Sequence, residues 1–552
     1  MKLRKRDSDG GLLNRSIKNP MVQYAGVISY IIFLLMRIPL SKVIGDAGIG
    51  LFAPAYEIFF LITIFTSYCM TRAMAGIIRY RVKRDQYKNA KRAFRAAFSM
   101  DLLISVVLAL LVLLMSKIIA DFFVLESFAR MAVMAVAPVI IFATFIGTFR
   151  GYFDGFGLGV LTAHSQYIES ISMAVCAFCF GDICYIYGTK VAALRQDNVY
   201  SYAYGALGAM LGVMVSQIIT TIHLLVVYVV YAGTLRGKLG MDGSKRLETQ
   251  YSLQGMVLRS SLPFAVSGII SNLYMLIDQR MFNYCMNKRE LGSERTGLWG
   301  CYYGKCAVLI SVGAALGVWS IYTAAGRISN AYDRGDYRIM RERIGKAVRR
   351  LCIVAFPTAI YLAALARAFA ECLIKGGSDE LTTWVQKGAV IIILYGCCFL
   401  FGQLMYRVHM IRELLFTAGI SLIVHVLTAY ILVQKALLGA DGIVYALILS
   451  FAVCGGLNFF LVSRNLKYKQ EWLGGIVFPA AAAGVSGVVV ALLSSFLLEP
   501  LGGMFTLLIG IVAGLFIYVT FLMILRVIGE AELSRIPLGF FFIMLGRNLG
   551  IL

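Results

Sequence analysis

Residues 102–115 read LLISVVLALLVLLM, an apolar run without a single charged side chain. With its flanks it is long enough to cross the hydrocarbon core of a bilayer as a helix, which takes ~20 residues. Runs of this kind recur along the whole chain. An apolar segment of this length can bury itself only in lipid, so we predict a polytopic helical membrane protein.

The composition excludes a soluble protein. Of the 552 residues, 60% are hydrophobic and 15% are charged, and the mean hydropathy is +0.79. The net charge of +23 is assigned to cytoplasmic loops by the positive-inside rule, so no nucleic-acid partner is expected. The twelve cysteines show no paired framework, and neither disulfides nor a metal site is expected.

Hydropathy and the breaks between apolar runs predict an all-α fold with fourteen membrane helices. These would form two six-helix lobes, related as a parallel repeat, plus two extra C-terminal helices. The predicted spans are residues 21–43, 49–78, 95–118, 128–149, 160–188, 200–232, 256–283, 297–325, 347–373, 383–406, 413–434, 439–463, 472–497 and 503–526.

Basic residues predict the orientation of these helices. The clusters 79–95 and 327–350 fall in loops that would be cytoplasmic if the N-terminus is cytoplasmic. Both termini are therefore expected inside, and no cleaved signal peptide is expected. The predicted domains are a basic N-terminus (1–20), an N-lobe (21–235), a cytoplasmic linker (236–255), a C-lobe (256–465), helices 13 and 14 (466–530) and an amphipathic cytoplasmic tail (531–552).

Several ionisable residues lie inside the predicted spans, where a charge is costly and usually faces a cavity or a partner. We expect an anion-binding cavity whose cations are oriented by acids. The alternative is that long basic side chains reach the headgroups, an alternative most open for Arg280. The candidate residues are Arg37, Glu57, Arg72, Asp278, Arg280 and Lys305.

An enzyme is not expected. The chain contains neither a Walker A phosphate loop nor a His-Glu-x-x-His zinc motif, and its predicted outer loops are short. No cofactor is expected either, although transport would need a coupling ion such as Na⁺ or H⁺, or the membrane potential.

A group of motifs resembles one family of membrane carriers. The segment Arg150-Gly151-Tyr152-Phe153-Asp154-Gly155 is followed by Ser165-Gln166 and then Glu169. Ile38-Pro39-Leu40-Ser41 and Leu273-Tyr274 with Ile277-Asp278 add to the likeness. The pattern is similar to MurJ-type lipid II flippases, stage V sporulation protein B and polysaccharide-export proteins of the multidrug/oligosaccharidyl-lipid/polysaccharide superfamily. Asp154 departs from the glutamine usual there. Ser29-Tyr30 and Tyr68-Cys69-Met70 replace the family's Ser-Arg and Gly-Phe-Pro, so the chain resembles a divergent member.

The resemblance implies a two-lobed, V-shaped, MATE-like carrier. It would move an undecaprenyl-pyrophosphate-linked saccharide from the inner to the outer leaflet of the bacterial plasma membrane by alternating access. Lys305 matches a basic residue that the family places on helix 8 for the pyrophosphate. Arg150, Gly151, Gln166 and Glu169 would line the cavity or pack the lobe.

Two other functions stay open at this point. One is a cation-coupled multidrug exporter of the same superfamily, and the other is a scaffold for cell-wall or spore-coat synthesis that transports nothing. The expected partners are the undecaprenyl-linked lipid, membrane lipids and the cell-wall synthesis machinery, and the carrier is expected to be a monomer.

Overall fold

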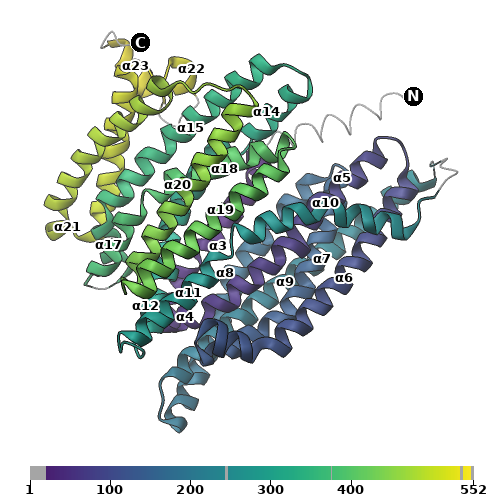
Figure 1. The fold of residues 1–552 in the computed structure, drawn as a ribbon, viewed down its shortest axis with the longest axis horizontal. Coiled ribbons are helices and arrows are strands. Elements are labelled where there is room, and N and C mark those ends of the chain that lie inside the picture. Colours follow the sequence, from purple (N-terminus) through teal and green to yellow (C-terminus); the bar gives the residue numbers. More distant parts are fainter. Residues whose placement is uncertain (1–19, 241, 243–246, 375, 535–538, 549–552) are drawn as a thin grey trace. The chain divides into compact units, whose positions relative to one another are not determined.

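The computed structural model describes residues 20–240, 242, 247–374, 376–534 and 539–548. Within these residues every regular element is a helix, as predicted (Figure 1). Twelve stretches are long and apolar enough to cross a membrane, and two of them run for 58 and 52 residues. The chain is thus an all-α multi-pass membrane protein, and the count of fourteen helices stays a prediction.

The elements follow one another without a strand in the described part of the chain. The first half contains α2 (Pro20–Gln23), α3 (Ala25–Leu35), α4 (Arg37–Thr63), η1 (Ile64–Cys69), α5 (Met70–Val82), α6 (Tyr87–Ile118), η2 (Ile119–Val124), η3 (Ser127–Ala129), α7 (Arg130–Gly155), α8 (Gly159–Arg195), α9 (Val199–Gly240) and α10 (Gln250–Ile270). The second half contains α11 (Tyr274–Lys288), α12 (Arg295–Cys301), η4 (Tyr302–Cys306), α13 (Ala307–Ile321), α14 (Ala324–Asp333), α15 (Tyr337–Ala364), α16 (Ala366–Leu373), α17 (Asp379–Gly388), α18 (Ile391–Arg407), α19 (Ile411–Ala429), η5 (Tyr430–Lys435), α20 (Ala440–Asn465), η6 (Leu473–Val477), α21 (Phe478–Ile524), α22 (Glu530–Leu533) and α23 (Gly539–Asn548).

Two glycines reverse the chain within the two longest stretches. Gly45 and Gly502 have φ angles of 73° and 72°, a region that residues with a Cβ rarely adopt. Arg37 and Glu57 would be ~30 Å apart on one straight helix, yet their charged atoms are 3.7 Å apart. Likewise Ala483 and Leu522 belong to one buried cluster. Each stretch therefore folds back on itself.

The contacts divide the chain into two compact units. Unit 1 comprises Met1–Gly304 and Val433–Gly439, and unit 2 comprises Lys305–Leu432 and Ala440–Leu552. Helices α10 and α12, whose residues the sequence assigned largely to the C-lobe, pack in unit 1, α10 on α5 and α6 and α12 on α4. The lobe boundaries drawn from the sequence stay a prediction.

The core of unit 1 is rich in aromatic side chains. Helices α6, α7 and α9 run side by side (Figure 1). The side chains of Phe94, Phe149, Tyr152 and Tyr228 meet between them. The rings of Phe94 and Tyr152 are 4.6 Å apart, a spacing typical of favourable aromatic pairs. This cluster fixes α7, which carries the motif around Arg150.

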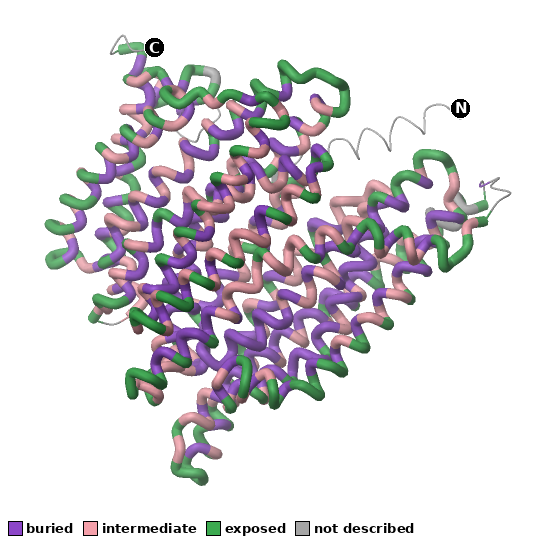
Figure 2. The backbone as a smooth tube through the Cα atoms, viewed as in Figure 1, coloured by how far each residue is buried: buried purple, intermediate pink, exposed green. Residues whose placement is uncertain are grey.

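The core of unit 2 is built on α15 and α21. The hydroxyl of Tyr361 donates to Ser486 at 2.9 Å, and that of Tyr518 donates to the carbonyl of Ile353 at 2.9 Å. On its other side α21 exposes large apolar residues such as Val488 and Phe496. Figure 2 shows exposed stretches, in green, along this helix. An exposed apolar surface along a membrane helix is the surface that lipid covers.

The predicted terminal segments are described only in part. Residues 1–19 of the basic N-terminus and parts of the linker and the tail lie outside the described residues. In the tail, α23 buries Phe542 in the cluster that contains Leu522, while Phe540 is exposed. This division of faces agrees with an amphipathic helix.

Candidate functional site

A buried arginine lies at the centre of the candidate site in unit 1. Arg37 is the first residue of α4 and is 6% exposed. Its guanidinium carbon lies 4.1 Å from the ring centroid of Tyr303 and 5.0 Å from that of Tyr56. Aromatic faces attract a cation most strongly where water is excluded, so the two rings hold the guanidinium among the helices.

Glu57 supplies the opposite charge. Its Oε1 accepts a hydrogen bond from the Tyr303 hydroxyl at 2.5 Å and lies 3.7 Å from Nη2 of Arg37. All three side chains are buried. The carboxylate is therefore bonded to the tyrosine and is only loosely paired with the arginine, because 3.7 Å exceeds a hydrogen-bond distance.

Arg37 keeps an unused donor. Its Nε is buried and has no hydrogen-bond acceptor among the described residues. Leaving a buried donor unpaired costs free energy, and a native protein that does so needs an explanation. The site thus presents a desolvated cation with a spare N–H group, which suits an anionic ligand better than a purely structural ion pair.

The local fold explains how these residues meet. The reversal at Gly45 brings the first turn of α4 back beside Tyr56 and Glu57. Tyr303 comes from η4, one turn of π-helix that follows α12, and α12 packs on α4. Single π-turns inside membrane helices re-aim side chains and are frequent at functional sites.

The other residues expected at the cavity differ in their surroundings. Asp278 on α11 is fully buried in unit 1. Arg280 is exposed and donates to the backbone carbonyls of Phe122 and Phe123 in η2. Arg72 is half-buried, with its guanidinium 4.8 Å from the ring centroid of Tyr68.

Lys305 is 5% exposed and lies in the same π-turn as Tyr303. It is the first residue of unit 2. Sequence reasoning identified Lys305 but missed Tyr303 and Tyr56. The available signal was that Tyr303 precedes the basic residue by two positions and that Tyr56 adjoins Glu57.

The motif residues form a second polar network in unit 1. Arg150 on α7 pairs with Glu169 on α8 at 2.7 Å and donates through Nε to the Ser165 hydroxyl at 2.8 Å. Gln217 on α9 donates to the other oxygen of Glu169 at 2.8 Å. The network therefore links the three helices α7, α8 and α9. Gln166, the residue after Ser165 on α8, is half-buried.

Asp154 and Gly151 extend this network along α7. The Asp154 carboxylate accepts a hydrogen bond from Thr162 at 2.7 Å, and its carbonyl accepts one from Arg79 at 3.0 Å. A Cβ on Gly151 would lie 2.5 Å from Met74 and 2.9 Å from the carbonyl of Thr71. Glycine is thus required where α5 and α7 touch.

Comparisons with known proteins agree with this architecture. The chain matches the family described as polysaccharide biosynthesis protein over residues 21–318. It is 21% identical over 526 residues to stage V sporulation protein B of Bacillus subtilis (strain 168), which covers 93% of this chain and 96% of that protein.

Solved structures show the same fold. The lipid II flippase MurJ in an inward closed conformation matches with a TM-score of 0.61 at 13% identity, covering 91% of this chain and 97% of that one. An inward-facing multidrug resistance MATE family transporter of the MOP superfamily matches with a TM-score of 0.59 at 14% identity, covering 82% of this chain and 98% of that one.

The family match covers more than half of the chain, and the motifs around Arg150 and Asp278 lie inside it. The resemblance that the sequence suggested is thereby confirmed. The chain therefore belongs to the polysaccharide biosynthesis protein family.

Proposed function

We propose that this protein moves an undecaprenyl-pyrophosphate-linked saccharide from the inner to the outer leaflet of a bacterial plasma membrane by alternating access, with both termini in the cytoplasm. The family match supports the class of substrate, and the basic clusters support the orientation. The lipid tail would stay in the bilayer while the charged headgroup passes through the protein.

One observation carries the proposal: Arg37 is a buried cation inside a membrane helix with a donor left unpaired. A pyrophosphate cannot cross hydrocarbon by itself, because an uncompensated charge there is too costly. A guanidinium held by two aromatic faces replaces part of its hydration and offers two parallel donors to its oxygens. Glu57 would balance Arg37 when no substrate is bound.

Lys305 is assigned to the same ligand as a second cation. Its burial argues against a headgroup-reaching role, and it follows Tyr303 by two residues in the same π-turn. Since the chain has no Walker A motif, we propose that ion exchange or the membrane potential drives transport. The potential supplies ~2.3 kcal/mol per charge for each 100 mV.

The test is flipping of a fluorescent undecaprenyl-pyrophosphate saccharide by purified protein in proteoliposomes, with Arg37→Gln compared with Arg280→Gln. Losing a charge-assisted contact of ~1.5–3 kcal/mol should slow flipping by Arg37→Gln roughly 10- to 150-fold. Arg280→Gln, which removes an exposed arginine, should flip at close to the wild-type rate.

Equal rates for wild type and Arg37→Gln would contradict the assignment of Arg37. Lys305→Arg should keep part of the activity, because the charge survives while the shape of the donor changes. A protein that flips no pyrophosphate lipid in any variant, but exports a cationic dye in a Glu57-dependent way, would instead be the multidrug exporter.

A further inference from the structure

A second charged site lies in unit 2, away from the buried arginine. A cavity of about 600 Å³ opens between the first turns of α15 and the segment that joins α20 to η6. Its charged lining consists of five cations and two carboxylates, an excess of three positive charges: Arg341, Glu342, Lys346, Arg349, Lys467, Lys469 and Glu471.

The loop at residues 467–471, which forms one wall of this cavity, has a backbone conformation defined by hydrogen bonds. Lys467 adopts a left-handed conformation with φ of 50°, and the amide of Tyr468 donates back to the carbonyl of Ser463 at 3.0 Å. This is a regular way to end a helix. Tyr468 is buried beside Gly345, and its hydroxyl donates to Gln470 at 2.5 Å.

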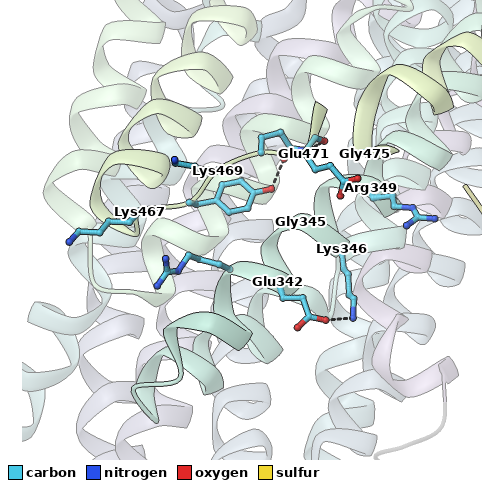
Figure 3. Close-up of a pocket in the computed structure, with 11 residues that line it drawn as sticks. Glu342, Gly345, Lys346, Arg349, Lys467, Lys469, Glu471 and Gly475 are labelled. Carbon is cyan, nitrogen blue, oxygen red and sulfur yellow. Dashed lines mark hydrogen bonds and ion pairs between the residues drawn. The ribbon is translucent and has the colours of Figure 1, made fainter. Parts of the chain in front are cut away.

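Part of the positive charge has no partner. Lys346 is paired with Glu342 at 2.5 Å, and Arg341 donates through Nε to the carbonyl of Tyr337. Nε of Arg349, by contrast, is buried and has no acceptor among the described residues. Figure 3 shows Lys346 and Arg349 on α15 and Lys467 and Lys469 on the segment above it.

Lipid-facing residues adjoin the cavity. Trp472 and Leu473 directly follow Glu471 and are 59% and 63% exposed. An exposed tryptophan next to lysines, at the start of an apolar helix, is typical of the level of lipid headgroups. Basic residues that only set the membrane orientation need to lie on one side of the membrane, with no particular arrangement among themselves. Here two segments more than a hundred residues apart place their cations around one cavity, which indicates a binding site.

We propose that this cavity, between the start of α15 and residues 467–471, binds the phosphate of an anionic phospholipid in the leaflet at that end of unit 2. Arg349, Lys467 and Lys469 provide the charge, and Trp472 and Leu473 lie where the glycerol and the first part of the acyl chains would pass. Basic pockets between membrane helices recognise anionic headgroups in this way. The proposal does not depend on which substrate the protein flips.

The test is native mass spectrometry of the purified full chain in detergent, titrated with phosphatidylglycerol or phosphatidylcholine. The variant Arg349→Gln with Lys469→Gln removes two pocket charges. The matched control, Arg338→Gln with Arg412→Gln, removes two exposed arginines outside the pocket. We expect the first phosphatidylglycerol to bind the pocket variant roughly 30-fold more weakly than wild type, and the control to bind nearly as wild type.

A second variant guards against misfolding. Lys467→Gln with Lys469→Gln changes two exposed loop residues and leaves Arg349 intact, so it should weaken phosphatidylglycerol by a similar factor. Equal phosphatidylglycerol affinity in the pocket and control variants would overturn the proposal. So would displacement of the lipid by inorganic phosphate, because the site would then take free phosphate and not a headgroup.

Discussion

The two units handle charge in different ways. Among the described residues of unit 1, each ion pair has at least one side chain that is nearly buried, such as Arg37–Glu57 at 7% and 9% side-chain exposure. In unit 2 the pairs Lys346–Glu342, Lys387–Asp441 and Arg547–Glu530 are all at least 32% exposed on both sides. The ion pairs of unit 1 are therefore largely buried, whereas those of unit 2 lie at the surface.

The burial of an ion pair determines how much stability is lost when one of its partners is replaced. Removing one partner of a buried pair leaves an uncompensated charge, while an exposed pair exchanges its partner for water.

Arg150→Met should lower the free energy of unfolding by about 3–5 kcal/mol, because it leaves Glu169 as an unpaired charge between α7, α8 and α9. Thermal unfolding in detergent measures it. The double substitution Arg150→Met with Glu169→Leu should recover most of the loss. Lys346→Met, which breaks an exposed pair of unit 2, is the control and should change stability little; a loss as large as that of Arg150→Met would end the contrast between the units.

Much of the fold was accessible from the sequence because apolar length is a local property. Runs such as 102–115 predict membrane helices whatever their neighbours are, and the motif at Arg150 predicts the family. The pairing of Arg37 with Glu57 depends on the turn at Gly45, whose positive φ is not visible in the letters alone. The sequence places both residues in predicted membrane spans, and the structure adds that their charged atoms lie 3.7 Å apart.

The aromatic part of the site was not accessible in this way. The chain contains 30 tyrosines, so Tyr303 and Tyr56 carry no compositional signal. Their role depends on a π-turn and on the packing of α12 against α4, both of which are tertiary facts. The basic pocket of unit 2 was likewise read only as topogenic charge, because its two walls are far apart in the sequence.

Asp101 tests the converse case in unit 1, a buried acid for which no ion-pair partner is present among the described residues. It is fully buried on α6, and neither carboxyl oxygen has a hydrogen-bond partner among the described residues. Asp101→Leu, similar in shape, should therefore raise the unfolding free energy by about 1–3 kcal/mol. Asp101→Asn keeps a polar group and should gain less. A stability loss with leucine would mean that the carboxyl serves a partner or a transported ion.

Lys387→Gln should have a smaller effect. Lys387 on α17 pairs with Asp441 at 2.7 Å, and both side chains are about one-third exposed. A pair at this exposure contributes about 0.2–1 kcal/mol. A double-mutant cycle with Asp441→Asn measures the coupling, and a coupling above that range would show that unit 2 also relies on internal charge.

The smallest expected effect is at the tail. Arg547 on α23 donates through Nε and Nη2 to the two oxygens of Glu530 on α22, at 2.9 and 3.0 Å. This hydrogen bond lowers the pKa of Glu530 below the ordinary range of glutamate. Because the folded-state pKa is the lower one, the contact stabilises the tail at neutral pH, and that contribution is lost as the pH falls through the folded-state pKa.

Hydrogen exchange of the α23 amides at pH 7 and about pH 3, corrected for the intrinsic rates, follows this loss. We expect acid to reduce protection in the wild type, whereas Glu530→Gln should show the reduced protection already at neutral pH. Glu532→Gln, an exposed acid of the same short helix, is the control and should behave as wild type. The thermal unfolding temperature of the whole protein should stay the same in both variants, because water replaces the lost partner of an exposed side chain. Global destabilisation by Glu530→Gln would show that the tail is part of the core of unit 2, and exposure would then be a poor guide to what a charge does in this protein.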